Sequence, residues 1–159
     1  MIRLAEPKEL PRLLQIYDMA RSYMCRSGNP TQWDPTYPGE ARLLEDITAK
    51  RLYVLEEADG ICACFMLAPG PDPTYAVIQE GCWGSNVPYG VIHRVAGDGT
   101  TRRVVAKCVA FAAQTYDHLR IDTHADNRPM QQALLREGFV HRGTIFAEDG
   151  TPRLAYDRF

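Results

Sequence analysis

The strongest constraint on the fold lies between residues 119 and 139, where a strand pattern passes directly into a helix pattern. The stretch LRIDTHA has the apolar and β-branched content of a strand. DNRPMQQALLREGF then opens with helix-capping residues and an early proline, and it places Met130 and Leu134 at helical spacing. Gly138 stands where the end of a helix needs a positive φ. A strand that leads straight into a helix favours an α/β fold.

The remaining segments extend this alternation along the chain. Strands are expected over residues 2–7, 74–83 and 89–97, and a pair of strands joined at Asp59–Gly60 is expected over 52–68. Helices are expected from Leu10, over 40–51 and over 104–116. A hairpin is expected over 139–159. No repeat, low-complexity tract or linker interrupts this order. The sequence therefore predicts one α/β domain over residues 1–159, a mixed sheet with helices packed on it.

Composition narrows the classes of partner. The 159 residues are 45% apolar and 24% charged, which is enough to bury a full core. A net charge of −2 argues against nucleic acid or an anionic membrane as a partner. No apolar run approaches the roughly 20 residues of a membrane span, and MIRLAEPKEL lacks the apolar core of a signal peptide. Five cysteines without metal-type pairing indicate reduced thiols, so a cytoplasmic protein is expected.

The junction GDGTTRRVVAKC, residues 97–108, combines flexible, cationic and helical features. Its glycines permit a tight loop that approaches a ligand closely. The first turn of the helix that follows presents unpaired N–H groups, which bind phosphate oxygens readily. Arg102 and Arg103 could add charge-assisted bonds to a pyrophosphate. Taken alone, the junction fits a polar surface turn equally well.

Two blocks together resemble the GNAT superfamily, the acyl-CoA-dependent N-acetyltransferases. VIHRVAGDGTTRRVVA is similar to the family's fourth strand, pyrophosphate loop and helix start. DNRPMQQALLREGF is similar to the segment that the family often writes as Asn, then Leu-Tyr-Glu-Lys-x-Gly-Phe; Asn127, Gly138 and Phe139 match it. The resemblance implies a mainly antiparallel central sheet with splayed middle strands and flanking helices. It also implies acetyl-CoA as co-substrate, with no metal.

The same resemblance implies a set of residues that bind acetyl-CoA. The backbone of Val95, Ala96 and Gly97 would bind the pantetheine arm in a strand-like manner, and a backbone N–H near Val95 would stabilise the oxyanion. The residues of the pyrophosphate loop would be Arg102, Arg103, Val104, Val105 and Ala106. Asn127 would reach the arm of the cofactor, although Asp126 or Asn127 can also serve as a helix cap.

Two positions depart from the family pattern. Val104 stands where the loop usually has glycine, and a β-branched residue does not easily adopt a positive φ. Leu134 stands where a tyrosine often protonates the departing thiolate, and leucine cannot donate a proton. Cys108 is expected to lie buried in its helix, which makes it a poor nucleophile.

Acetyl transfer to an amine requires a base, because the amine is mostly protonated near neutral pH. His93, two residues before the cofactor-binding strand, is one candidate, and His124 is a second. Either ring could instead be structural. Glu80 is a further candidate for a base or an acceptor-binding carboxylate. In a strand, side chains two residues apart share a face, so Asp122, His124 and Asp126 could together form a metal site. No second cluster of ligands in the sequence supports that interpretation.

The loop SGNPTQWDPTYPG, residues 27–39, is where this family usually builds its acceptor pocket. Its three prolines and two glycines exclude a helix. Trp33 and Tyr37 could clamp a small amine-bearing molecule, or they could pin the loop onto the core.

The resemblance and these residues predict an acetyl-CoA-dependent N-acetyltransferase that acts by direct attack of a small amine. The alternative is a non-catalytic acyl-CoA-binding or sensing module of the same fold. A homodimer is left open.

Overall fold

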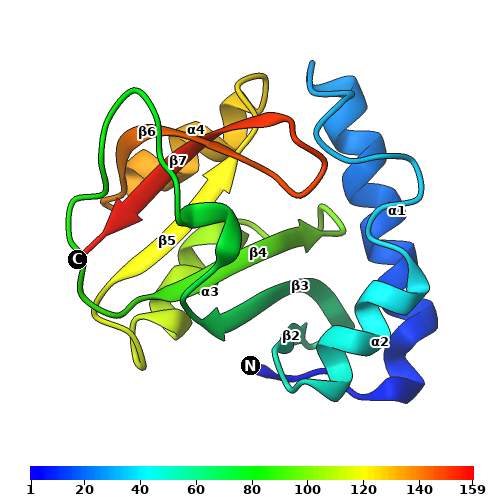
Figure 1. The fold of residues 1–159 in the computed structure, drawn as a ribbon. Coiled ribbons are helices and arrows are strands. Elements are labelled where there is room, and N and C mark those ends of the chain that lie inside the picture. Colours follow the sequence, from blue (N-terminus) through cyan, green and yellow to red (C-terminus); the bar gives the residue numbers. More distant parts are fainter. The chain divides into compact units, whose positions relative to one another are not determined.

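The computed structural model describes all residues 1–159 and contains four α-helices and seven strands (Figure 1). The helices are α1 (Leu10–Arg26), α2 (Glu40–Thr48), α3 (Val104–Ala112) and α4 (Arg128–Arg136), with short 3-10 helices η1 (Pro7–Glu9) and η2 (Pro73–Tyr75). The strands are β1 (Ile2–Leu4), β2 (Leu52–Glu57), β3 (Gly60–Pro69), β4 (Gly90–Gly97), β5 (Leu119–Thr123), β6 (Val140–Phe146) and β7 (Pro152–Arg158). This mixed α/β fold with a mainly antiparallel sheet confirms the predicted class. None of the helices combines the length and apolar character that crossing a membrane requires.

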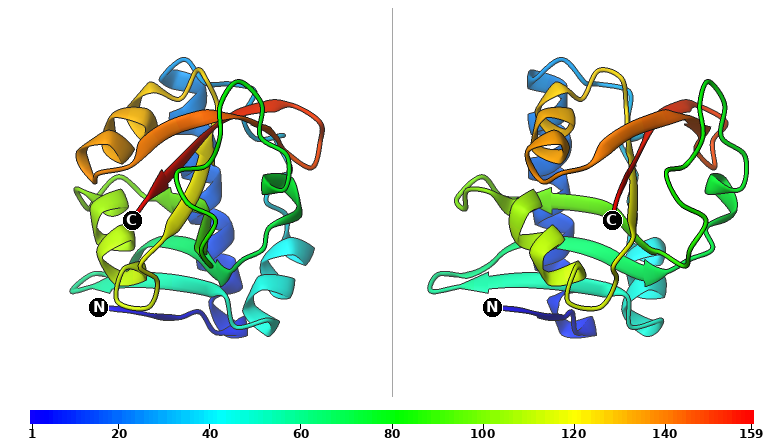
Figure 2. Two further views of the ribbon diagram at one scale, coloured as in Figure 1. Left: turned by 60° about the vertical axis from the view of Figure 1, so that its left-hand side comes forward. Right: turned by 90° about the vertical axis from the view of Figure 1, so that its left-hand side faces the viewer.

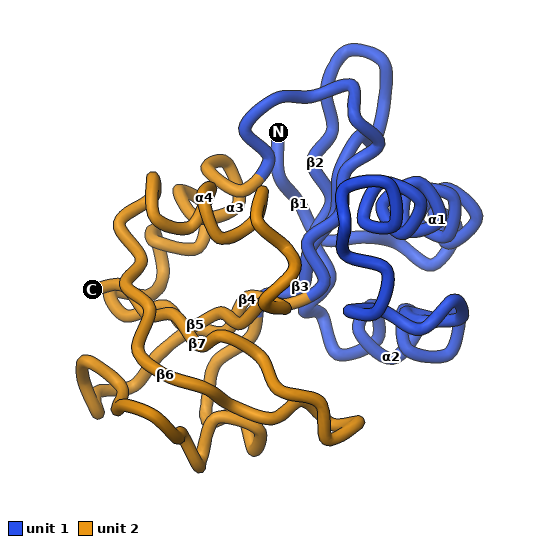
Figure 3. The backbone as a smooth tube through the Cα atoms, turned by 90° about the horizontal axis from the view of Figure 1, so that it is seen from above, with its two compact units in different colours: residues 1–67, 94–104 blue, residues 68–93, 105–159 orange.

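The chain forms two compact units (Figure 3). The first unit comprises residues 1–67 and 94–104, and the second comprises residues 68–93 and 105–159. One of the three boundaries falls inside β4, between His93 and Arg94; the others fall inside β3 and α3. That these units make one domain stays a prediction.

The first unit packs α1 and α2 on one face of an antiparallel sheet made by β1, β2 and β3 (Figure 3). α1 buries side chains three and four residues apart, as its sequence pattern predicts. Its core consists of Ala5, Leu13, Ile16, Tyr17, Ala20, Leu43, Ile47, Leu52, Val54, Cys64 and Ala96. Apolar burial of this kind stabilises a fold by about 25 cal/mol per Å².

In the second unit, β4 begins as a parallel neighbour of β5, and β5, β7 and β6 follow as antiparallel neighbours. The parallel register joins Gly90 to Leu119 and Val91 to Arg120. α3 and α4 lie on one face of these strands, and the connection over residues 70–89 crosses the other face (Figure 2). This connection brings Tyr75 and its neighbours to the sheet.

The prediction of a strand over residues 74–83 is wrong. Tyr75 lies in η2, and Gln79 makes a single bridge to Thr144. The side chain of Asp72 accepts a hydrogen bond from the backbone N–H of Thr74, which favours a turn over an extended chain. Tyr75 is buried and Ile78 packs against the same core cluster, but Val77 is 66% exposed, so the segment buries apolar side chains without pairing as a strand. Strand propensity without a pairing partner does not make a strand.

A buried carboxylate fixes the course of β4 in the first unit. Asp46 of α2 is fully buried, and its Oδ1 accepts a hydrogen bond from Nε of Arg51 at 2.7 Å. Its Oδ2 lies 2.9 Å from Nε and 2.7 Å from Nη2 of Arg94. Arg94 has a φ of 52°, an uncommon value for a residue other than glycine. The ion pair therefore holds β4 in a kinked backbone conformation that the chain alone disfavours.

Asp46→Ala is expected to lower the free energy of unfolding by about 3–5 kcal/mol, because it leaves the buried guanidinium of Arg94 without its counter-charge. Urea denaturation measures the loss. Glu45→Ala is the matched control: Glu45 also contacts Arg51, at 3.3 Å, but its side chain is 63% exposed. That variant is expected to lose about 1 kcal/mol or less. Losses of equal size would contradict the assignment of Asp46 as the anchor.

Candidate functional site

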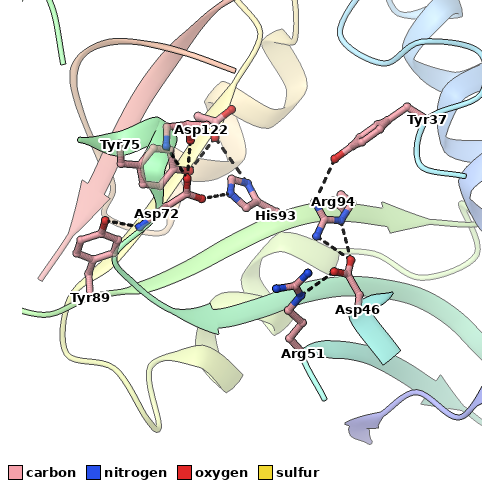
Figure 4. Close-up of polar contacts among 10 residues, drawn as sticks. Tyr37, Asp46, Arg51, Asp72, Tyr75, Tyr89, His93, Arg94 and Asp122 are labelled. Atoms are coloured by element: carbon pink, nitrogen blue, oxygen red, sulfur yellow. Dashed lines mark hydrogen bonds and ion pairs between the residues drawn. The ribbon is translucent and has the colours of Figure 1, made fainter. Parts of the chain in front are cut away.

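His93 of β4 is paired with a carboxylate from the connection before the strand (Figure 4). Its Nε2 lies 2.7 Å from Oδ2 of Asp72. The other oxygen of Asp72 accepts hydrogen bonds from the backbone N–H and the hydroxyl of Thr74, at 2.9 and 2.7 Å. Because both oxygens of Asp72 are engaged, the carboxylate is held in place against the imidazole.

A second carboxylate lies on the other side of the same ring. Oδ2 of Asp122, on β5, is 3.7 Å from Nδ1 of His93. Tyr75 donates its hydroxyl hydrogen to that same oxygen at 2.7 Å. The ring of Tyr75 is 5.7 Å from the imidazole, centroid to centroid. His93 thus sits between two carboxylates and beside an aromatic ring, with 22% of its side chain exposed.

These contacts change the proton affinity of the partners. Burial disfavours the charged form of Asp72, but hydrogen bonds from His93 and Thr74 outweigh it and lower the pKa of Asp72 to about 2. Burial, followed by the charge of Asp122, raises the pKa of Tyr75 well above its ordinary value. Asp72 is therefore a carboxylate, and Tyr75 keeps its proton at neutral pH.

The predicted cofactor-binding strand starts directly after the kink at Arg94. The carbonyl of Arg94 accepts a hydrogen bond from the hydroxyl of Tyr17 at 2.8 Å, and its guanidinium donates to the hydroxyl of Tyr37 at 3.0 Å. Both ends of this residue are consequently fixed. Val95 and Gly97 are half-buried and Ala96 is buried.

In the predicted pyrophosphate loop, residues other than Val104 adopt the positive φ that a glycine would supply. The positive φ falls on Arg103, at 60°, and on Gly99, at 86°, rather than on Val104. Val104 is the first residue of α3, where a β-branched side chain is tolerated. Val104 thus needs no positive φ, in keeping with its β-branched side chain.

The start of this loop is fastened within the first unit. The backbone N–H of Asp98 donates to the carbonyl of Cys62 at 2.9 Å, and the Asp98 carboxylate accepts from Arg12 at 2.7 Å and from Thr100. Beyond it, the side chains of Arg102 and Arg103 are exposed, and Val104, Val105 and Ala106 form the half-buried first turn of α3. The loop therefore leads two exposed arginines up to a helix N-terminus, a combination that suits a phosphate group.

Two further predicted residues act locally in the structure. Oδ1 of Asn127 accepts the backbone N–H of Met130 and caps α4, as the alternative reading allowed. Nδ1 of His124 accepts the backbone N–H of Asp126 at 3.0 Å. A role for Asn127 in cofactor binding, and for His124 in proton transfer, stays a prediction.

The structure places the predicted acceptor-binding residues in different settings. Trp33 packs against the core of the first unit, 5.7 Å from the ring of Tyr17, and Tyr37 lies 6.1 Å from Trp33. The packing of Trp33 does not decide whether these aromatic residues also contact an acceptor, and that role stays a prediction. Glu80, in the second unit, is exposed and accepts a hydrogen bond from the hydroxyl of Thr144 at 2.9 Å.

Asp122, His124 and Asp126 do not converge as a group of three, although Nδ1 of His124 lies 3.6 Å from Oδ2 of Asp126. β5 ends at Thr123, so strand alternation no longer aligns His124 with Asp122. Asp122 contacts Tyr75, whereas His124 contacts the backbone of Asp126. The structure has no group of three or more His, Cys, Asp or Glu side chains that could hold a metal ion.

The five cysteines form no disulfide, and Cys62, Cys64 and Cys108 are buried. Burial raises the pKa of Cys64 to about 12, which keeps it a thiol. Cys108, 1% exposed, is inaccessible as a nucleophile, as expected.

Sequence reasoning missed Asp72 and Tyr75 and considered Asp122 only as a metal ligand. A local signal for Asp72 exists in the pattern Asp-x-Thr, which forms the same side-chain turn at Asp34, Asp98 and Asp149. The pattern indicates where a carboxylate is held, but it does not indicate which side chain faces that carboxylate.

Neither the models of known protein families nor the curated proteins compared with this chain include a match. Solved structures do match. A GNAT-family acetyltransferase from Streptococcus agalactiae is 27% identical with a TM-score of 0.89, and the likeness covers 100% of this chain and 94% of that one. A GNAT-family acetyltransferase from Listeria monocytogenes is 16% identical, with a TM-score of 0.72 over 99% and 93% of the chains. The ribosomal-protein-alanine N-acetyltransferase of Brucella melitensis is 19% identical, with a TM-score of 0.61 over 100% and 99%. At 16% and 19% identity, the similarities to the Listeria and Brucella proteins show the fold alone.

The carboxyl group of Asp72 is expected to titrate near pH 2, below its ordinary value of 3.8. Because its pKa is lower in the folded chain than in the unfolded chain, the carboxylate stabilises the fold above about pH 4, and this contribution is lost as the pH falls toward 2. The carbon-13 shift of the carboxyl group, followed by NMR, gives the midpoint. His93→Ala removes a donor and is expected to raise that midpoint. An unchanged midpoint in this variant would show that the imidazole does not hold Asp72 ionised.

Proposed function

This chain is a GNAT-superfamily enzyme of the N-acetyltransferase type, and from that premise we propose that it transfers the acetyl group of acetyl-CoA to the amine of a small acceptor. One observation carries the proposal. On a single strand, β4, a histidine paired with a carboxylate stands two residues before the segment predicted to bind the pantetheine arm. The proposed base and the segment proposed to hold the thioester therefore lie two residues apart on one strand.

The proposed reaction is a direct displacement. The amine nitrogen attacks the thioester carbonyl carbon, a C–N bond forms, the C–S bond breaks, and the sulfur leaves with the electron pair. An ammonium acceptor loses one proton to a base before attack, and a second proton passes from nitrogen to sulfur as the intermediate collapses. Two substrates held side by side supply much of the acceleration, so no covalent enzyme intermediate is required.

His93 is proposed as the base. An imidazole is suited to this role because its unperturbed pKa of about 6.5 lets it take and release a proton near neutral pH. It would act on the ammonium directly or through one bound water. Leu134 is fully buried in α4 and has no proton to give, so the nitrogen of the intermediate is the proposed source of the thiol proton.

The residues proposed to bind acetyl-CoA are those of β4 after its kink, the loop that follows, and the cap of α4. They are Val95, Ala96, Gly97, Arg102, Arg103, Val104, Val105, Ala106 and Asn127. Backbone N–H groups in the first turn of α3 and two exposed arginines fit the doubly anionic pyrophosphate.

The acceptor is proposed to be a small amine, with Trp33, Tyr37 and Glu80 as the proposed contacts. His124 is the second proposed proton-handling residue. A cytoplasmic location is part of the proposal and is supported by five cysteines outside any disulfide.

The decisive test measures acetyl-CoA binding by calorimetry and CoA release with a thiol reagent over a panel of amines. The expected result is saturable acetyl-CoA binding together with CoA release that depends on at least one amine. Binding without amine-dependent release on any member of the panel would instead favour an acyl-CoA sensor, the alternative that Leu134 motivates. No binding would refute both.

The exposed arginines of the loop give a separate prediction. Arg102→Ala combined with Arg103→Gly is expected to weaken CoA binding about tenfold or more, because each charge-assisted hydrogen bond contributes roughly 1.5–3 kcal/mol. Glycine is chosen at position 103 because it keeps the positive φ of 60° without strain. Isothermal calorimetry compares CoA with pantetheine, which lacks the pyrophosphate and is expected to bind the variant almost unchanged. Arg136→Ala, which removes one exposed charge from α4, is the control for net charge. Equal weakening for both ligands would remove these arginines from phosphate binding.

A further inference from the structure

We propose that Asp72 and Asp122 are the positioning residues of His93: Asp72 fixes the proton on Nε2, which makes Nδ1 the atom that accepts the proton from the acceptor, and Asp122 faces the charge that results. This inference rests on the proposed function for its catalytic meaning. Its structural content, the protonation state and orientation of the ring, can be tested without any activity.

The placement of the proton follows from what a carboxylate can do. An ionised carboxylate accepts hydrogen bonds and cannot donate them. The contact of 2.7 Å between Nε2 of His93 and Oδ2 of Asp72 is therefore an N–H that donates to oxygen. In neutral imidazole the other nitrogen then carries the lone pair. Nδ1 is the basic atom of the ring.

Asp72 is itself held too firmly to follow a rotating ring. Its second oxygen accepts from the backbone and the side chain of Thr74, and its own backbone N–H donates to the hydroxyl of Tyr89 at 2.9 Å. Only 16% of its side chain is exposed. Its low pKa, about 2, keeps it ionised throughout the physiological range, so the acceptor for Nε2–H is permanent.

Asp122 stands at the opposite nitrogen. Its Oδ2 is 3.7 Å from Nδ1, longer than a hydrogen bond but within ion-pair distance once the ring is protonated. Tyr75, 1% exposed, donates to that oxygen and holds the carboxylate at this distance. A gap of this length leaves Nδ1 unengaged by Asp122 when the ring is neutral, and it places a negative charge beside the ring when Nδ1 gains a proton.

The groups that face His93 are these two carboxylates and the phenol of Tyr75. The guanidinium of the adjacent Arg94 is bound by Asp46 instead. When an ammonium donor transfers one proton to Nδ1, the positive charge forms between these two carboxylates. Release of that proton to solvent restores the neutral ring, so the cycle needs no further reactant.

Histidine NMR tests the structural claim directly. Protein labelled with nitrogen-15 at its four histidines gives imidazole signals, and His93→Gln assigns that of His93. The expected result is a downfield, slowly exchanging proton on Nε2. In Asp72→Asn the acceptor is neutral and weaker, so that proton is expected to move upfield and exchange faster. Asp149→Asn is the matched control, because Asp149 makes the same turn with Thr151. A proton on Nδ1, or an unchanged signal in Asp72→Asn, would overturn the proposal.

Kinetics test the catalytic meaning with the amine that serves as substrate. Asp72→Asn and Asp122→Asn are each expected to lower kcat about tenfold to a hundredfold, with little change in KM for acetyl-CoA. In a His93→Gln background, Asp72→Asn is expected to have no further effect on kcat, because it acts through the ring. An additive loss, or a change in KM for acetyl-CoA as large as the change in kcat, would overturn the positioning role. A wild-type chain that transfers to no amine would refute the proposed function, while the NMR result would still decide the state of the ring.

Discussion

The carboxylate of Asp46 binds two guanidiniums inside the first unit, and the course of β4 depends on it. A non-glycine residue at a φ of 52° costs about 1–3 kcal/mol unless its surroundings hold it there. Arg94 is held at three points, by Asp46, by the hydroxyl of Tyr37 and by the hydroxyl of Tyr17. The kink survives because a strained backbone is compensated by a buried, fully paired side chain.

Consecutive residues of β4 thus belong to two different networks. The guanidinium of Arg94 is committed to a structural ion pair, whereas the imidazole of His93 lies between two carboxylates that are themselves held by Thr74 and Tyr75. In a regular strand, neighbouring side chains point to opposite faces of the sheet. Here the positive φ of Arg94 additionally changes the direction of the backbone after this residue. The residues that follow are the ones proposed to bind the pantetheine arm.

Much of this arrangement could be predicted from local patterns. Helical spacing located α1 and α2, and Gly138 stands at the end of α4 with a φ of 86°, as its position predicted. The resemblance indicates His93 as a candidate base, but it does not indicate the carboxylates that face the ring. The strand expected over 74–83 failed because a run of β-formers has no meaning without a neighbouring strand. The positive φ appeared on Arg103 rather than Val104, since loop geometry is set by how the whole loop closes.

The sequence by itself determined most of the order of helices and strands, and it indicated the segments in which cofactor-binding residues and a base are proposed. Periodicity, turn residues and capping residues act over a few positions, so they can be seen in one dimension. Only the tertiary structure decided which carboxylates meet His93. Asp72 lies 21 residues before it and Asp122 lies 29 residues after it. No local rule connects positions so far apart, because their contact depends on how the connection over 70–89 and β5 pack within the second unit.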